Sequence, residues 1–479
     1  MPVISHVTCP VCGSFCDDIE VTVQDNVIMG VRNACAVGAA KFLDYANHRI
    51  ANPLVRKNGE LAEASLGEAV KKSAEILIDA NYPILYGWSS TSCEAIRIGL
   101  ELAEEVGGVI DNTSTICHGP SILSIQDVGI ASCTLGQLRH RADLIFYWGC
   151  DPWSAHPRHV ERYTTFSNGR FQRSTWRAHV SRLGGILSKK RLRRAINLVL
   201  GRDIFATPEI SRELPYTMFQ KKRKMIVVDV RKTHSAEAAD YFLQVEPNKD
   251  YELLQAFRML IANEELDVDH VAGVPVETLD EIADVMIGCK LGVIFFGLGL
   301  TMTEGKLRNI DAAISLVRDL NQRTKFLIMP MRGHFNVAGA NVVFTWQTGF
   351  PFAIDFSQGY PQYNPGETSV IDILCREEAD AGLVIASDPV AHFPKEAAQN
   401  LVKNPLIVID PQTTPTSLMA DVVFPSTFVG IETEGTAYRM DHVPLPLKKI
   451  VEPPTNCLSD VEILQRILHE VRRLRSKRK

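Results

Sequence analysis

The 479-residue sequence lacks several features that would assign it to a familiar class. No apolar run approaches the roughly 20 residues that a helix needs to cross a bilayer. The N-terminus has no basic segment followed by an apolar signal core. No Walker A loop is present, and no G-x-G-x-x-G opens a strand–helix unit, so an ordinary NAD site is not expected. These absences predict a cytoplasmic protein without a transmembrane segment.

The chain also lacks a strong excess of charge of one sign. Its 51 basic and 56 acidic residues give 51 − 56 = −5, so bulk charge does not favour nucleic acid. Basic residues gather between 168 and 224, with a run at 189–194, and again at 472–479. These are either solvated helix faces or surfaces that dock acidic partners or membrane. Nucleic-acid binding would call for aromatics interleaved with the charge. The aromatics of this region lie outside the run: Phe171, Trp176 and Phe205.

The chain has 11 cysteines, an odd number that does not suggest a disulfide framework. Four of them open the chain with uneven spacing: Cys9, Cys12, Cys16 and Cys35. A tight loop can aim the first three thiolates at three corners of a cubane, and Cys35 returns to the fourth. Four thiolates are the usual ligands of a [4Fe–4S] cluster. A zinc site is the alternative, although zinc more often uses two matched C-x-x-C pairs.

Most of the chain alternates between apolar strands and amphipathic helices. Strands are predicted at 82–87, 144–149, 225–231, 293–297, 326–329, 383–387, 406–410 and 421–425. Helices are predicted at 66–79, 91–107, 251–263 and 307–321. Continuous apolar strands separated by helices are typical of parallel sheets covered on both faces. The sequence therefore predicts an α/β fold with two domains built on mostly parallel sheets.

Several predicted strands end in glycine or in polar side chains that suit a nucleotide. Ligands of such sheets bind at the carboxyl ends of the strands. Glycine allows close backbone approach to phosphate, and a carboxylate can bind ribose hydroxyls or guanine amino groups. As a set, these residues predict an extended dinucleotide ligand: Gly149, Asp151, Asp229, Arg231, Gly297, Gly299, Thr301, Ser387, Asp388 and Asp410.

Four segments, in this order, resemble the molybdopterin-dependent oxidoreductases over nearly the whole chain. They are CPVCGSFC with Cys35, RIANPLVRKNG followed by EASLGEAV, DVRKTHSAEAADYFLQVEPNKDYELLQAF, and ADVVFPSTFVGIETEGTAYRMDHVPLP. The third is similar to the dinucleotide-binding stretch of the family and adds Thr233 to the expected cofactor contacts. Within that family, the strings TICHGPS and MPMRGHFN resemble the catalytic B subunits of formylmethanofuran dehydrogenases.

The resemblance implies an active site. Cys117 would ligate tungsten or molybdenum, held also by two molybdopterin guanine dinucleotides, and the sequence does not distinguish the two metals. His118 and Arg332 would flank the open face of the metal, with His334 as a secondary candidate. Lys41 would sit between cluster and pterin. The residue types suit reduction of CO2 to formate, because arginine offers a fork of donors to a carboxylate. Histidine can move a proton.

The resemblance also implies domains and partners. We expect a cluster domain at 1–55 with 415–479 packing back, one pterin-binding domain at 56–140 plus 332–414, and another at 141–331 with a basic insertion at about 166–224. The C-terminal β-barrel cap of many relatives is missing and would come from another subunit. An amidohydrolase-like subunit would condense formate with methanofuran, and ferredoxin-like subunits would supply electrons. The alternatives are a formate dehydrogenase that releases free formate and a non-catalytic electron-transfer subunit.

Overall fold

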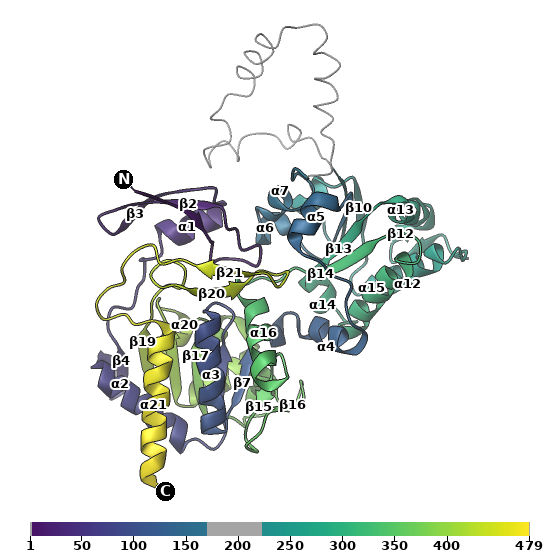
Figure 1. The fold of residues 1–479 in the computed structure, drawn as a ribbon. Coiled ribbons are helices and arrows are strands. Elements are labelled where there is room, and N and C mark those ends of the chain that lie inside the picture. Colours follow the sequence, from purple (N-terminus) through teal and green to yellow (C-terminus); the bar gives the residue numbers. More distant parts are fainter. Residues whose placement is uncertain (1, 170–222, 479) are drawn as a thin grey trace, which may run out of the picture. The chain divides into compact units, whose positions relative to one another are not determined.

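The computed structural model describes residues 2–169 and 223–478, shown as a ribbon in Figure 1. The basic run at 189–194 and nearly all of the expected insertion lie outside the described residues. The chain divides into two compact units. The first unit comprises 1–31, 37–119 and 332–479, and the second comprises 32–36 and 120–331.

The first unit is built on a nine-stranded sheet of order β16-β15-β7-β6-β17-β18-β19-β4-β5. Its centre is parallel: β7 (Val109–Asn112), β6 (Pro83–Gly87), β17 (Ala381–Ile385), β18 (Leu406–Asp410) and β19 (Val422–Pro425). Its margins are antiparallel: β15 (Ile354–Asp355), β16 (Gln362–Tyr363), β4 (Leu54–Lys57) and β5 (Glu60–Glu63). The chain order runs outward from β6 in one direction and from β17 in the other, so a topological switch lies between these strands.

Helices cover both faces of this sheet. One apolar cluster joins the sheet to α2 (Leu66–Asp79), α3 (Cys93–Val106), α16 (Val337–Thr348) and α21 (Asp460–Arg478), which Figure 1 shows together. The opposite face packs on α17 (Val370–Cys375) and α19 (Lys395–Lys403). Local sequence sets the helix ends: Ser65 and Ser92 accept hydrogen bonds from the backbone amides of the first turns, and Gly107 closes α3 in the left-handed conformation.

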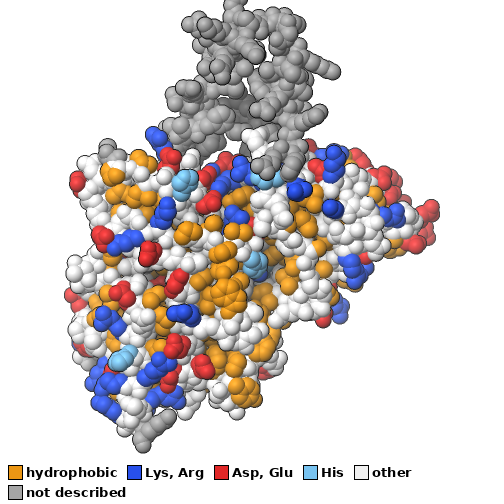
Figure 2. All heavy atoms as spheres, in the orientation of Figure 1, with side chains coloured by type: hydrophobic (Ala, Val, Ile, Leu, Met, Phe, Trp, Pro, Cys, Tyr) orange, Lys and Arg blue, Asp and Glu red, His pale blue; other side chains and the backbone are white. Residues whose placement is uncertain are grey.

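Smaller elements complete the first unit. A three-stranded antiparallel sheet, β1 (Val3–Val7), β2 (Ile19–Gln24) and β3 (Val27–Arg32), brackets the first three cysteines and is followed by α1 (Ala36–Leu43). The late segment forms the hairpin β20 (Gly435–Tyr438) and β21 (Pro444–Leu447), and two short helices are α18 (Pro389–His392) and α20 (Pro415–Met419). In Figure 2, hydrophobic side chains gather where α16 and β20 lie. Trp346 of α16 is 70% exposed, and its ring lies 6.0 Å from that of Tyr438.

The second unit has a five-stranded parallel sheet of order β10-β9-β8-β13-β14. Its strands are β8 (Leu144–Trp148), β9 (Lys224–Asp229), β10 (Tyr241–Gln244), β13 (Gly292–Phe296) and β14 (Phe326–Pro330). One apolar cluster joins it to α12 (Asp250–Ile261), α13 (Val276–Gly288) and α15 (Leu307–Leu320). Shorter elements are α4 (Gly119–Val128), α5 (Leu135–Arg141), α6 (Pro152–Ala155), α7 (His159–Arg162), α11 (His234–Glu237), α14 (Leu298–Thr301), β11 (His270–Val271) and β12 (Val274–Pro275).

The predicted α/β class with mostly parallel sheets is confirmed. The predicted strand 406–410 and helix 66–79 coincide with β18 and α2. The short strand β7 and helix α16 were not predicted, because β7 has only four residues and α16 is apolar without clear periodicity. The three-domain division stays a prediction beside the two units. In the part of the chain that is described, no helix is long and apolar enough to span a membrane.

Candidate active site

The first unit presents Cys117 at the end of a short turn that follows β7. Residues Thr113–Ile116 form the 3-10 helix η1, and Cys117 closes it. The Asn112 side chain accepts a hydrogen bond from the Ser114 amide at 3.0 Å, and the Cys117 amide donates to the Ser114 carbonyl oxygen at 3.0 Å. The turn is therefore closed at both ends, which fixes where the Cys117 side chain begins.

A buried carboxylate anchors this turn to the sheet. One oxygen of Asp111 accepts from the amides of Asn112 (2.8 Å) and Ala353 (3.0 Å). The other accepts from the Thr115 hydroxyl (2.6 Å) and the Val370 amide (3.0 Å). Burial raises the pKa of the Asp111 carboxyl to about 6, and these four donors oppose the rise. Asp111 thus ties the Cys117 turn to β15 and α17.

Arg332 lies in the same unit and is electrostatically coupled to Cys117. Its side chain is buried, with 3% of the residue exposed. Burial lowers the pKa of the guanidinium to about 10, and the negative charge of a Cys117 thiolate opposes this effect. Burial raises the pKa of the Cys117 thiol to about 11, and the charge of Arg332 acts against the rise. Opposite charges on Arg332 and on a Cys117 thiolate therefore stabilise each other, with Arg332 buried and Cys117 partly exposed.

The two histidines of the predicted site differ in burial. His118, next to Cys117, is fully buried. His334 is exposed, and its backbone forms an isolated antiparallel bridge with Cys12. The structure therefore gathers Cys117, His118 and Arg332 in one unit and keeps His334 at the surface.

The first three cysteines lie on one compact loop after β1. The Cys9 amide donates to the Cys16 carbonyl oxygen at 2.8 Å, and the Phe15 amide donates to that of Cys12 at 2.9 Å. Cys9 and Cys16 are buried and Cys12 is partly exposed. Cys35 belongs to the segment 32–36, which groups with the second unit. The first three cysteines thus lie on one short loop, and their joint ligation of a cluster with Cys35 stays a prediction.

Neither a disulfide nor a single-ion site is found where the chain is described. The cysteines are thiols rather than disulfides. Among residues 2–169 and 223–478, no group of three or more His, Cys, Asp or Glu side chains is arranged to hold one metal ion. A cubane cluster binds each thiolate to a different iron, which is a wider arrangement than the ligand set of one ion.

The cysteine loop packs directly on the segment that carries Arg332. The Gly13 amide donates to the Gly333 carbonyl oxygen at 3.0 Å, and the Met440 amide donates to that of Gly13 at 3.0 Å. The bridge between Cys12 and His334 continues this pairing. The predicted cluster loop and the predicted active-site arginine are therefore parts of one backbone network.

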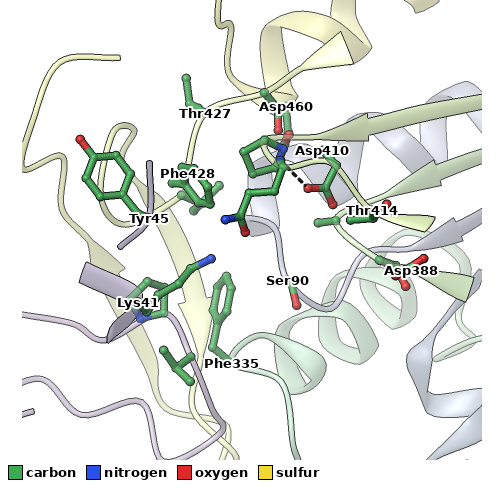
Figure 3. Close-up of a pocket in the computed structure, with 18 of the residues that line it drawn as sticks. Lys41, Tyr45, Ser90, Phe335, Asp388, Asp410, Thr414, Thr427, Phe428 and Asp460 are labelled. Carbon is green, nitrogen blue, oxygen red and sulfur yellow. Dashed lines mark hydrogen bonds between the residues drawn. The ribbon is translucent and has the colours of Figure 1, made fainter. Parts of the chain in front are cut away.

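A pocket of about 540 Å³ opens at the carboxyl ends of the parallel strands of the first unit. Loops after β6, β17, β18 and β19 line it, so it spans the topological switch, where ligands of α/β sheets bind. Figure 3 shows Lys41 reaching into the pocket from α1, with Asp410 across from it. Thr414 and Asp388 also line the pocket, and Oδ1 of Asp388 accepts from the amide and the hydroxyl of Thr416. Four predicted cofactor contacts thus line one pocket: Lys41, Ser387, Asp388 and Asp410.

Lys41 and the carboxylate of Asp410 influence each other's pKa in this pocket. Burial raises the pKa of the Asp410 carboxyl to about 7. The hydrogen bond that Asp410 accepts from the Gln412 amide (2.8 Å) and the positive charge of Lys41 oppose this rise. Burial lowers the pKa of Lys41, and negative charge on Asp410 and on Cys9 opposes this. Lys41 is therefore coupled both to the pocket and to the cysteine loop.

An aromatic ring and an ion pair form the wall behind Lys41. The Lys41 ammonium lies 4.5 Å from the centre of the Phe428 ring, and the Arg49 guanidinium lies 5.3 Å from it. Arg49 is bound to both oxygens of the buried Glu432 at 2.7 and 2.8 Å. The Phe428 amide donates to Glu432 at 2.9 Å. This fixed wall holds the Lys41 side chain toward the pocket.

Two buried oxygen atoms of the pocket have no hydrogen-bond partner among the described residues. They are Oδ1 of Asp460 and Oγ1 of Thr427. The second oxygen of Asp460 accepts from the Thr91 hydroxyl at 2.5 Å. Buried polar atoms are rarely left unsatisfied, and a carboxylate oxygen accepts only. The pocket therefore suits a ligand that offers N–H or O–H donors.

The remaining predicted contacts lie in the second unit at the ends of β8, β9 and β13. Three glycines allow these loops to pack closely. A Cβ at Gly149 or Gly299 would lie 2.7 or 2.6 Å from a backbone atom of the other glycine, and a Cβ at Gly297 would lie 2.6 Å from Cβ of Cys150 and 2.8 Å from the Gly149 carbonyl oxygen. The Gly299 amide donates to the Gly149 carbonyl oxygen at 2.9 Å. Close packing of the two loops thus accounts for these glycines, apart from any ligand. The three glycines lie at the topological switch of this sheet, between β8 and β13.

The polar residues among the predicted cofactor contacts of the second unit differ in their surroundings. Asp151 accepts from the hydroxyls of Ser235 and of Ser154 (2.7 Å). Asp229 accepts from the Arg231 amide at 3.2 Å, and the Arg231 side chain is exposed. Thr233 caps α11 through the Ala236 amide, and Thr301 is fully buried. Asp229 and Arg231 therefore remain the members best placed to meet a ligand at this edge.

Sequence reasoning missed several residues of the site. Asp460, Thr427, Phe428 and Ser90 line the pocket, and Asn341 contacts Arg332. Thr427 and Phe428 lie in the late segment that resembles the family, so this resemblance could have pointed to them. Asn341 gave no signal, because it lies on the unpredicted helix α16.

One family model and two close relatives in sequence match this chain. The family model described as molybdopterin oxidoreductase matches residues 196–470. The chain is 46% identical to the B subunit of the tungsten-containing formylmethanofuran dehydrogenase 2 of Methanocaldococcus jannaschii, over 98% of this chain and 99% of that one. The corresponding protein of Methanococcus maripaludis is 42% identical, with the same coverage.

Solved structures share the fold. A chain of the formyltransferase/hydrolase complex of Methylorubrum extorquens, crystallised with methylofuran, has a TM-score of 0.64 at 18% identity, covering 88% of this chain and 99% of that one. Acetylene hydratase of Pelobacter acetylenicus has a TM-score of 0.67 at 14% identity, covering 98% of this chain and 69% of that one. At these identities, the likeness shows the architecture alone.

Proposed function

The chain belongs to the molybdopterin oxidoreductases and, within them, to the B subunits of tungsten-containing formylmethanofuran dehydrogenases, and from this we propose that it is the catalytic subunit of such an enzyme. It reduces CO2 reversibly: CO2 + 2 e⁻ + H⁺ gives formate. The observation that carries the proposal is the buried guanidinium of Arg332, which the Asn341 amide links to Ser114 of the turn that ends at Cys117.

The residues of the first unit fit a pterin cofactor. The ring systems of a molybdopterin guanine dinucleotide carry amino and ring N–H donors, which match the unsatisfied oxygen of Asp460 and the carboxylates of Asp388 and Asp410. We assign one dinucleotide to this pocket with Ser387 as a further contact. The strand ends of the second unit, with Asp229 and Arg231 foremost, would hold another.

The chain's own groups act on substrate and proton. Bound through the pterins and the Cys117 thiolate, tungsten or molybdenum supplies a centre that exchanges two electrons. Arg332 presents N–H donors to the developing carboxylate, and burial strengthens that attraction. His118, buried beside Cys117, holds or transfers the proton. The closed turn of residues 113–117 keeps the thiolate in place.

Electrons enter through the cysteine loop. We propose that Cys9, Cys12, Cys16 and Cys35 hold a [4Fe–4S] cluster, and that Lys41 lies on the route from it to the pterin. The coupling of Lys41 to both Cys9 and Asp410 supports this route. The pairing of Gly13 with Gly333 supports a short connection from the cluster loop to the substrate site.

The enzyme works within a complex. Relatives that span nearly the whole chain are named as subunits. We propose an amidohydrolase-like subunit that receives formate for condensation with methanofuran, a barrel subunit that caps the pterins, and ferredoxin-like subunits that deliver electrons. The exposed apolar surface around Trp346 supports the proposal that this chain contacts other subunits.

Cofactor analysis of the complex purified without oxygen tests the proposal. We expect about one W or Mo, two pterin guanine dinucleotides and at least four Fe per chain, together with methanofuran-dependent turnover of CO2. A purified complex that turns over free formate and contains no amidohydrolase subunit would make the chain a formate dehydrogenase subunit. Iron without W, Mo or pterin would make it an electron-transfer subunit, and zinc in place of iron would overturn the cluster.

A further inference from the structure

Asn341 of α16 links the side chain of Arg332 to the turn that carries Cys117. Its Oδ1 accepts a hydrogen bond from Nη1 of Arg332 at 2.8 Å. Its Nδ2 donates to the Ser114 hydroxyl at 2.9 Å and to the Pro351 carbonyl oxygen at 3.0 Å. Ser114 belongs to the turn that ends at Cys117. The two groups that would face the substrate are thus joined through one side chain.

The orientation of this amide is fixed by its partners. Both hydrogens of Nδ2 are engaged with oxygen acceptors, so the carbonyl oxygen must face the guanidinium. Asn341 is itself buried, with 6% exposed, and lies within the regular part of α16. Arg332 therefore meets an acceptor that cannot turn away without leaving Ser114 and Pro351 unsatisfied.

The acceptor is also neutral. A buried carboxylate in this place would form an ion pair with Arg332 and cancel most of its charge. An amide satisfies one N–H of the guanidinium and adds no negative charge beside it. A site that must attract a carboxylate is served by a fixed fork of donors whose anchor does not itself compete as an anion.

We propose that Asn341 is a positioning residue that holds the Arg332 guanidinium beside the Cys117 turn through a neutral acceptor, in the place where the guanidinium meets the substrate carboxylate. The inference rests on the proposed function, because it assigns formate to Arg332. It goes beyond that function because it names the residue that fixes the position of the Arg332 guanidinium and so its attraction for the substrate carboxylate. Asn341 acts through Arg332 and does not touch the substrate.

The test uses formate oxidation by the whole complex with a viologen acceptor. In Asn341→Asp we expect the KM for formate to rise at least tenfold, because the new carboxylate competes with formate for Arg332. In Asn341→Ala we expect a rise of several-fold, because the guanidinium loses its fixed partner. The kcat should fall less than the KM rises in both, with W or Mo content unchanged. Thr345→Ala is the matched control, since it removes a hydrogen bond to the Asn341 backbone from the same helix.

An unchanged KM in metal-replete Asn341→Asp and Asn341→Ala would overturn the inference. If neither variant assembles, Ser114→Ala decides, because it removes one anchor of the amide and leaves its contact with Arg332. A raised KM there supports the inference, and an unchanged one contradicts it. Failure of the proposed function looks different: the wild-type complex would then hold no W or Mo or would not oxidise formate at all.

Discussion

Gly13 of the cysteine loop lies against the carbonyl oxygen of Arg332, so closely that a Cβ at position 13 would be 2.2 Å from that oxygen. Real Cβ contacts are never this short, so no other residue fits without a shift of one backbone or the other. The proposed cluster loop and the arginine of the proposed substrate site are therefore in direct backbone contact. A change in either one reaches the other without an intervening side chain.

Substitution of Gly13 should consequently damage both sites. We expect Gly13→Ala to destabilise the chain by about 1–3 kcal/mol, the usual cost of overpacking, and to lower both iron content and turnover. Thermal melting and iron analysis measure this. Gly333→Ala is the matched control, because a Cβ there meets no atom within 4 Å. Equal iron content and melting temperature in the two variants would show that the contact has no consequence.

Asp111 should be required for the Cys117 turn. Asp111→Asn replaces an acceptor oxygen by an NH2 group that faces donors, so two of the four hydrogen bonds are lost. Leaving buried donors unsatisfied costs about 1–3 kcal/mol each. We expect a clearly lower melting temperature and lower W or Mo content at equal expression. Thr115→Val, which removes only one of these bonds, should show a smaller change in both. A metal content equal to wild type in Asp111→Asn would separate Asp111 from the Cys117 site.

The pocket and its fold were partly predictable from the sequence. Strand β18 is a continuous apolar run that ends in Asp410, and both the strand and the position of the aspartate follow from pattern and strand-end chemistry. The position of Asn341 did not follow. Its partners Ser114 and Arg332 are 227 and nine residues away, and no local pattern encodes a side-chain bridge formed by tertiary packing. Likewise, the strand-end glycines of the second unit look like phosphate loops in the sequence, whereas packing of two backbones already requires them.

Asp410 should make the stability of the cofactor-free chain depend on pH. The pKa of its carboxyl is about 7 in the folded chain and about 3.9 when unfolded. The folded state therefore binds the proton more tightly, and its contribution to stability is full below about pH 4 and lost as the pH rises through about 7. The loss is at most about 4 kcal/mol.

Melting temperatures between about pH 4.5 and pH 7.5, a window set by these two pKa values, measure this effect. The wild-type chain should lose stability across that range, and Asp410→Asn should lose less, because its amide does not titrate. Asp421→Asn is a suitable control, since Asp421 accepts backbone hydrogen bonds at the opposite end of the same strand pair. Parallel pH profiles for wild type and Asp410→Asn would show that Asp410 does not carry the pH dependence.

Lys41 should raise the reduction potential of the proposed cluster. Its ammonium is held over the Phe428 ring and is coupled to Cys9, a proposed cluster ligand. A positive charge stabilises the reduced, more negative cluster, so Lys41→Met should make the midpoint potential more negative, by roughly 60 mV if the charge is worth about 1.4 kcal/mol for one electron. A redox titration followed by electron paramagnetic resonance measures the shift. Lys71→Met, on the exposed face of α2, removes the same charge away from the loop and should leave the potential unchanged. If Lys41→Met also leaves the potential unchanged while turnover falls, Lys41 serves the pterin pocket alone, and the cluster is tuned by other groups.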